Sequence, residues 1–196
     1  MKEEILPVVL DGKEVPGYFI SNTGNVYCSL KSKRGDKGRF IGTYVSESKK
    51  LLKPREERHP DGTVKCFRIK IYFDRGFFDY EYQQSPKTSS KQRKNVSVHK
   101  MVMSAFKPFY ENPPAHISNE EWENTPNSVK KLLEECIIIN HIDHNPANNC
   151  LWNLEYVTPK ENSRKAKDFY GGNCANKRSI LIKKPKIEVP NILNFL

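Results

Sequence analysis

The stretch INHIDHNPANNCLWNLEYVTPKEN, residues 139–162, decides the fold of this chain. It begins on an apolar run and continues into a loop rich in Asn and Asp, residues that satisfy their own backbone in tight turns. Residues 154–157 then alternate as a strand. Thr158 and Pro159 suit the N-cap and first position of a helix, and Glu161 completes a capping-box pattern. The order strand, loop, strand, helix predicts a ββα unit.

Two upstream segments accompany this stretch. VHKMVMSAF, residues 98–106, has the apolar spacing of a helix, and PGYFISNTGNVY, residues 16–27, contains two short strands around an Asn-rich turn. In this order the three segments resemble the HNH, or His-Me finger (ββα-metal), nucleases of phage and intron-encoded homing endonucleases, together with their small N-terminal module. The resemblance implies an α+β fold and metal-dependent hydrolysis of double-stranded DNA. It also implies Mg²⁺ (or Mn²⁺) as the cofactor.

The resemblance assigns roles to four residues of the motif. His141 is the expected general base, because a histidine can be neutral near pH 7. Asn140 and Asn162 are the expected metal ligands, since they offer the hard oxygen atoms that Mg²⁺ prefers. Such a cation would stabilise the charge on the phosphorus centre and on the leaving oxygen. Asn153 is expected to hydrogen-bond the far ring nitrogen of His141 and fix its tautomer.

Several features of the motif leave alternatives open. Many relatives carry Asp where this chain has Asn140, and an amide is a weaker ligand, so a DNA-binding protein that keeps the ββα shell without cutting is the main alternative. Adjacent strand residues point to opposite faces, so Asn140 and His141 converge only where the strand ends or bends. His144 stands where Gly is common, and it either contacts DNA or tolerates the bend. Asp143 is interpreted as a turn residue.

A zinc-stabilised DNA-binding module is a third interpretation. Its ligands would be four residues with the spacing C-x4-H-x2-H-x5-C, which is not the spacing of a common zinc finger. These residues are Cys136, His141, His144 and Cys150. His99 lies at a position that the nuclease motif shares, but it is interpreted as structural.

The sequence before the motif predicts mostly β structure. Residues 63–73 form the clearest strand, with Phe67 and Ile71 on its apolar face and with Arg68 and Lys70 on the other face. Residues 31–62 show little periodicity and are predicted to be loops with short strands. Residues 83–94 are predicted to be a hairpin loop. Further predictions are a capping box at 118–121, a helix over 128–134 and a buried strand over 136–139.

Charge gives an independent indication of the partner. Thirty-three Lys and Arg against 23 Asp and Glu give a net charge of +10 and a pI near 9.3, which favours binding to a polyanion. The basic residues gather in segments 31–58, 87–100 and 163–186, as a surface that follows DNA phosphates requires. The cations expected to bind DNA are Arg68, Lys70, Lys94, Arg164 and Lys165.

Composition excludes several classes of protein. No window approaches the ~18 apolar residues of a membrane span, so no membrane partner is expected. The N-terminus has acidic residues where a signal peptide carries cations, and the five scattered cysteines do not suggest a disulfide framework, so an intracellular protein is expected.

Three parts are predicted: a β-rich DNA-binding region over 1–94, the nuclease unit over 95–168, and a basic C-terminal arm over 169–196.

Overall fold

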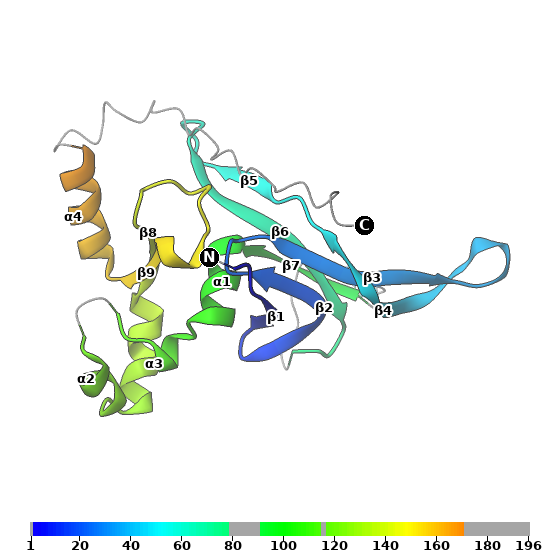
Figure 1. Ribbon diagram of the computed structural model, residues 1–196, viewed down its shortest axis with the longest axis horizontal. Coiled ribbons are helices and arrows are strands. Elements are labelled where there is room, and N and C mark those ends of the chain that lie inside the picture. Colours follow the sequence, from blue (N-terminus) through cyan, green and yellow to red (C-terminus); the bar gives the residue numbers. More distant parts are fainter. Residues whose placement is uncertain (1, 79–90, 115–116, 171–196) are drawn as a thin grey trace.

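The first half of the chain folds into two antiparallel sheets (Figure 1). The computed structural model describes residues 2–78, 91–114 and 117–170. The first sheet has the strand order β1-β2-β3-β4, and the second has the order β5-β6-β7. The strands are β1 (Ile5–Leu10), β2 (Lys13–Ser21), β3 (Val26–Arg34), β4 (Phe40–Leu51), β5 (Arg55–Arg58), β6 (Val64–Asp74) and β7 (Lys91–Ser97), and a one-turn helix, η1 (Asp36–Gly38), joins β3 to β4.

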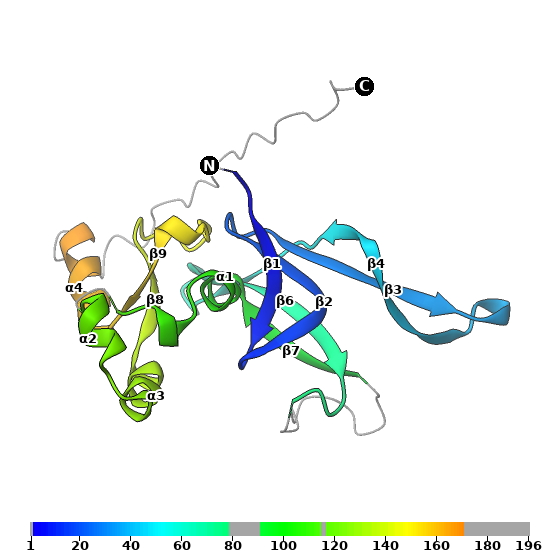
Figure 2. The same ribbon diagram turned by 60° about the horizontal axis from the view of Figure 1, so that its bottom comes forward.

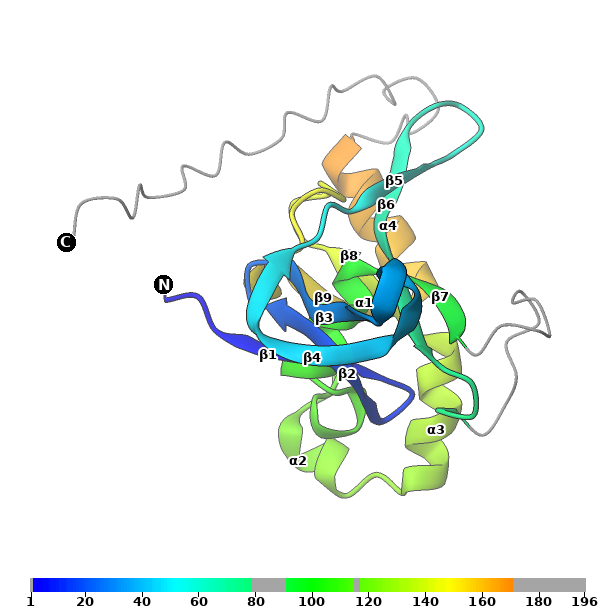
Figure 3. The same cartoon turned by 90° about the vertical axis from the view of Figure 1, so that its right-hand side faces the viewer.

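Helices and one small hairpin make up the second half. The strands β8 and β9 pair as this hairpin, and α4 follows directly. Figures 1 and 3 show α4 on one side of the hairpin and α2 with α3 on the other. The α+β fold class and the strand, strand, helix order are therefore confirmed. The elements are α1 (Val98–Phe106), η2 (Phe109–Glu111), α2 (Asn119–Glu123), α3 (Asn127–Cys136), β8 (Ile138–His141), η3 (Leu151–Asn153), β9 (Leu154–Val157) and α4 (Pro159–Tyr170).

One hydrophobic core joins the sheets to the hairpin. Helix α1 lies between them (Figure 2) and contacts β1, β2, β6, β7 and η3. Buried residues of both sheets, of α1 and of the hairpin meet in this core, among them Val8, Ile20, Ile71, Met101 and Leu154. The ββα hairpin thus shares one core with the N-terminal sheets, with α1 between them. The three-part division remains a prediction, and most of its C-terminal arm lies outside the described residues.

Local signals placed several elements correctly. In β6, Ile69, Ile71 and Phe73 are buried as the alternation predicts, while Phe67 is only half-buried. The turn between β2 and β3 occupies residues 22–25. Helix α2 begins with the predicted capping box, in which Ser118 and Glu121 exchange hydrogen bonds.

The expectation of loops with short strands over residues 31–62 was wrong for β4, which is a strand of 12 residues. Strands β3 and β4 form a long two-stranded ribbon that projects from the body, as Figure 2 shows. Large apolar side chains of β4 lie exposed on it, including Ile41 and Val45 at 55% and 56%. Apolar and polar residues alternate along a strand when one face is buried and the other is in solvent. Both faces of this ribbon are in solvent, so the periodicity that identifies half-buried strands was absent.

Two other boundaries also differ from the predictions. Lys91 already belongs to β7, so the C-terminal side of the predicted 83–94 loop is strand, while residues 79–90 lie outside the described part. The buried strand expected over 136–139 is wrong, because Cys136 ends α3 and Ile138, which begins β8, is 37% exposed. An apolar run alone cannot distinguish a helix end from a strand start.

Within the described residues, no helix combines the length and the apolar character needed to cross a membrane.

Candidate active site

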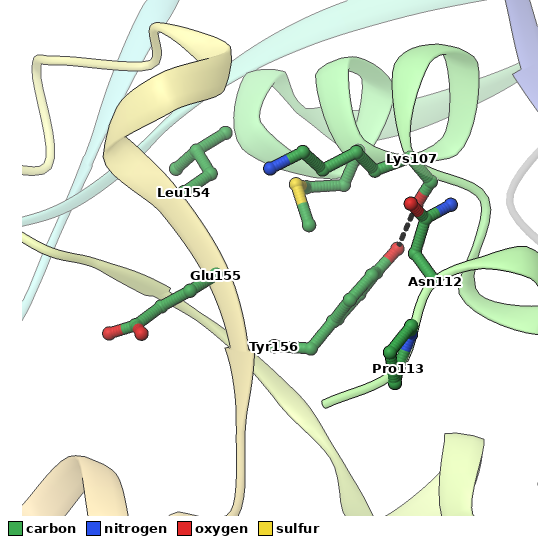
Figure 4. A pocket seen from close by; sticks show the side chains of 7 residues that line it. Lys107, Asn112, Pro113, Leu154, Glu155 and Tyr156 are labelled. Carbon is green, nitrogen blue, oxygen red and sulfur yellow. Dashed lines mark hydrogen bonds between the residues drawn. The ribbon is translucent and has the colours of Figure 1, made fainter. Parts of the chain in front are cut away.

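Strand β9 directs its side chains alternately to two sides. Tyr156 faces α1, and its hydroxyl donates to the Lys107 carbonyl at 2.8 Å, while Glu155 points to the opposite side of the strand (Figure 4). In the hairpin, Asn140 is paired with Glu155 and His141 is paired with Leu154. Because directly opposed residues of an antiparallel pair share a face, Asn140 and His141 point to opposite sides of β8.

The side-chain contacts agree with this division into two faces. Asn140 is 7% exposed, and its Nδ2 donates to Glu155 Oε1 at 2.8 Å. The His141 ring instead contacts His99 of α1, edge to face, with the ring centroids 5.4 Å apart. The expected base and the expected metal ligand are therefore neighbours in sequence at the end of β8, each held by a different set of contacts.

Asn149 holds the His141 ring. Its Oδ1 lies 3.2 Å from His141 Nε2, and its Nδ2 donates to the carbonyl oxygens of Pro146 and Ala147 at 3.3 and 3.4 Å. These two carbonyl acceptors fix the orientation of the Asn149 amide. Since Oδ1 can only accept, Nε2 must carry the proton, and Nδ1 keeps the lone pair. Among the described residues no hydrogen bond engages Nδ1, so this atom is available as a base.

Electrostatics favour the neutral form of this ring. Burial lowers the pKa of His141, although the bond to Asn149 and the nearby Asp143 partly oppose that shift. Burial also lowers the pKa of His99 to about 3, assisted by His141 and by the cations Lys100 and Arg68. Both rings are therefore uncharged at neutral pH. A neutral His141 is the form that can accept a proton.

The loop that carries Asn149 is closed by Asp143 and Asn153. Asp143 accepts hydrogen bonds from Asn145 N, Asn148 Nδ2 and Asn153 Nδ2 at 2.7 to 2.8 Å. Asn153 also accepts from Asp143 N at 3.0 Å and donates to Asn148 O at 2.8 Å. The interpretation of Asp143 as a turn residue is confirmed. The expected bond from Asn153 to the ring is wrong: Asn153 braces the loop, and Asn149 makes the bond to His141.

His144 and α4 restrain the other side of this loop. His144 has a φ of 56°, in the left-handed region where Gly is favoured, which fits the bend expected at this position. Its ring packs on Phe169 of α4 with the centroids 4.4 Å apart. The bend is therefore tied to the helix that completes the ββα unit.

A charged cluster lies on the Asn140 side of the hairpin. Lys165 of α4 places its Nζ 2.8 Å from both carboxylate oxygens of Glu155 and 3.5 Å from Glu161 Oε1. Hydrogen bonding to Glu155 raises the pKa of Lys165, so the amine stays charged. Asn162 lies in the first turn of the same helix, but no hydrogen bond in the described chain links its side chain to Asn140. The structure thus brings Asn140, Glu155 and Lys165 together.

The cations expected to bind DNA fall into two groups. Arg68 Nε lies 2.6 Å from Glu57 Oε2, Lys94 Nζ lies 2.9 Å from Asp11 Oδ2, and Lys165 pairs with Glu155 as described above. Lys70 is half-buried and Arg164 is exposed, and neither forms an ion pair with another described residue. A DNA phosphate would have to compete with a carboxylate for the first group and not for the second.

The four residues of the zinc interpretation do not gather. Cys136 is exposed at the end of α3, and the Cys150 thiol donates to the Thr23 carbonyl at 3.6 Å. Across the part of the chain that the structure describes, no three His, Cys, Asp or Glu residues are grouped so that they could hold a metal ion. The zinc alternative therefore has no geometric support.

Fold and site together define an α+β chain with a half-buried histidine at the end of a ββα hairpin. No protein-family model and no curated protein matches the sequence. The fold is similar to a solved structure that describes DNA binding and cleavage by the HNH homing endonuclease I-HmuI, with a TM-score of 0.40 and 20% identity over 86% of this chain. This chain spans 60% of the length of that protein.

Proposed function

We propose that this protein is a metal-dependent DNA endonuclease of the HNH homing type, in which His141 is the general base. The observation that carries the proposal is the Asn149–His141 bond, which leaves Nδ1 as the proton acceptor of a neutral imidazole. In the reaction, Nδ1 takes a proton from a water molecule while the water oxygen attacks the phosphorus atom. The P–O bond to the leaving 3′ oxygen then breaks, and that oxygen takes up a proton.

The oxygen donors on the other face of β8 suit a hard divalent cation. Asn140 uses its Nδ2 for Glu155, so its Oδ1 is the atom left to face a ligand, and the Glu155 carboxylate lies on the same face. We propose Asn140 and Asn162 as ligands of Mg²⁺ or Mn²⁺, with Glu155 as a nearby source of negative charge. When bound, the cation would stabilise the developing charge on the phosphate and on the leaving oxygen.

The non-cleaving DNA-binding protein stays as the second candidate because of the same cluster. Asn140 brings no charge, and Lys165 already neutralises Glu155. Plasmid cleavage with and without Mg²⁺ separates the two candidates. Conversion of supercoiled DNA to nicked or linear products only when the metal is present supports the nuclease, while binding without any product over a long incubation supports the alternative.

The variant Asn140→Asp tests the ligand role. It replaces an N–H···O bond with two opposed carboxylates, so in EDTA the free energy of unfolding should fall by about 1–3 kcal/mol. Added Mg²⁺ should recover much of that loss, and cleavage should be kept or increased, because a carboxylate is the stronger ligand. Chemical denaturation with and without metal measures the first effect.

The matched control exchanges the two groups. Asn140→Asp combined with Glu155→Gln restores an amide-to-carboxylate hydrogen bond in the reverse direction, and it should regain stability in EDTA. A stable single variant with no response to Mg²⁺, or a catalytically dead one, would remove Asn140 as a ligand.

DNA binding is expected to depend on the cations that have no competing carboxylate. Lys70→Ala and Arg164→Ala should each reduce the slope of log K against log salt by about one unit. Each variant makes one phosphate contact fewer, so fewer counterions are released when the protein binds DNA. Arg68→Ala should have a smaller effect, since Glu57 already neutralises Arg68. Lys131→Ala, an exposed cation of α3, is the control and should leave the slope unchanged. Equal slopes for all four variants would mean that DNA does not contact Lys70 and Arg164.

A further inference from the structure

The turn between β2 and β3 lies directly against the loop that carries Asn149. The backbone N–H of Leu151 donates to the Asn22 carbonyl at 2.8 Å, and the Cys150 thiol donates to the Thr23 carbonyl at 3.6 Å. Three consecutive turn residues therefore face three consecutive loop residues in antiparallel order, and the last pair in this series is Gly24 with Asn149.

Gly24 permits this close approach. Its φ is +83°, and a Cβ added to it would lie 2.9 Å from Asn149 Cβ and 3.0 Å from the Asn149 carbonyl oxygen. Real Cβ atoms do not approach other heavy atoms so closely, and the obstacle includes backbone. A side chain at position 24 would therefore force the turn and Asn149 apart, and the amide of Asn149 holds the His141 ring.

The turn itself is firmly anchored. Ser21 Oγ accepts from the Asn25 backbone N–H at 3.1 Å, and Gly24 N donates to the Ser21 carbonyl at 2.9 Å. Asn22 ties the turn to the N-terminal segment, accepting from Glu4 N with its Oδ1 at 3.2 Å. A turn held in this way can act as a fixed support for the loop.

We propose that the β2–β3 turn is a positioning element for His141, which it orients by fixing the backbone of residues 149–151 and thereby the Asn149 amide. The N-terminal sheet then does more than bind DNA, because it also sets the tautomer and the angle of the catalytic ring. The orientation of the His141 ring can be measured whether or not the protein cuts DNA. Only the use of that orientation for catalysis rests on the proposed function.

Gly24→Ala tests the proposal against a matched control. Gly62 has the same φ of +83° but no atom within 4 Å of an added Cβ, so Gly62→Ala imposes the same backbone strain without the displacement. Gly24→Ala should slow single-turnover cleavage by about tenfold to a hundredfold, the scale of a small misplacement of a reacting group, while DNA affinity changes less than about twofold. Gly62→Ala should leave both quantities near those of the parent.

The ¹⁵N chemical shifts of the His141 ring give the readout that needs no cleavage. In the parent and in Gly62→Ala, Nε2 should appear protonated and Nδ1 unprotonated, and in Gly24→Ala the two tautomers should mix. Unchanged His141 shifts in a folded Gly24→Ala protein would overturn the proposal. If the shifts change but the parent does not cut DNA, the positioning stands and the proposed function fails.

A milder variant covers the case in which Gly24→Ala does not fold. Cys150→Ala removes one of the three contacts without adding bulk, and Cys28→Ala is its control at a half-buried thiol of β3. Cys150→Ala should shift the His141 ring resonances in the same direction by a smaller amount, and Cys28→Ala should not move them. Unchanged His141 resonances in Cys150→Ala would then overturn the proposal that the β2–β3 turn orients this ring.

Discussion

Replacing His141 with Ala is expected to lower the cleavage rate by about 10²–10⁴-fold, the usual contribution of a positioned general base. DNA affinity should change little, because Lys70 and Arg164, the cations proposed for the phosphates, lie outside the His141 contacts. Single-turnover kinetics and a binding isotherm at one salt concentration measure the two effects separately.

The control for this variant is His59→Ala. His59 is an exposed histidine in the turn between β5 and β6, far along the chain from the hairpin, and its removal should leave the cleavage rate unchanged. Undiminished cleavage by His141→Ala would remove the base from the proposed mechanism. Loss of DNA binding by the same variant would show instead that the ring has a structural role.

Replacing Ile71 with Ala should destabilise the protein by about 2–5 kcal/mol, the range for truncation of a large aliphatic side chain in a core. Ile71 has no exposed surface and lies in the core that joins the sheets, α1 and the hairpin. Urea denaturation followed by circular dichroism gives the free energy of unfolding.

Tyr72 is the matched control, because it follows Ile71 in β6 and its side chain points to the other face, 45% exposed. Tyr72→Ala should therefore cost much less than Ile71→Ala. Phe67→Ala should also cost less, since Phe67 is only half-buried at the edge of the core. Equal losses for Ile71 and Tyr72 would mean that β6 does not have one core face and one outer face.

The parts of the fold that the sequence predicted are those with local causes. Thr158 Oγ1 accepts from Glu161 N at 3.2 Å and Pro159 begins α4, so the start of this helix could be predicted from adjacent residues. The alternation in β6 was informative because one face of the strand enters the core. Residues of β4 gave no comparable signal, since that strand lies in a ribbon exposed on both sides.

The site was only partly predictable for a similar reason. The positions of Asn140 and His141 follow from the motif, but the partner of the ring does not. Asn149 and Asn153 are both buried amides of one loop, and the residue that reaches the ring depends on how the loop folds back over eight residues. Glu155 could have been found from the predicted hairpin, because it stands directly opposite Asn140.

The contact between the β2–β3 turn and the loop after β8 also bears on when the His141 ring is oriented during synthesis of the chain. Thr23 and Cys150 are 127 residues apart in the chain, so the N-terminal sheet leaves the ribosome long before its loop partner exists. Non-local contacts of this kind form late, after the intervening chain has been ordered. The His141 ring therefore acquires its orientation only after residues 149–151 have been synthesised, and a shorter nascent chain, even one that already carries folded sheets, lacks the contacts that orient this ring.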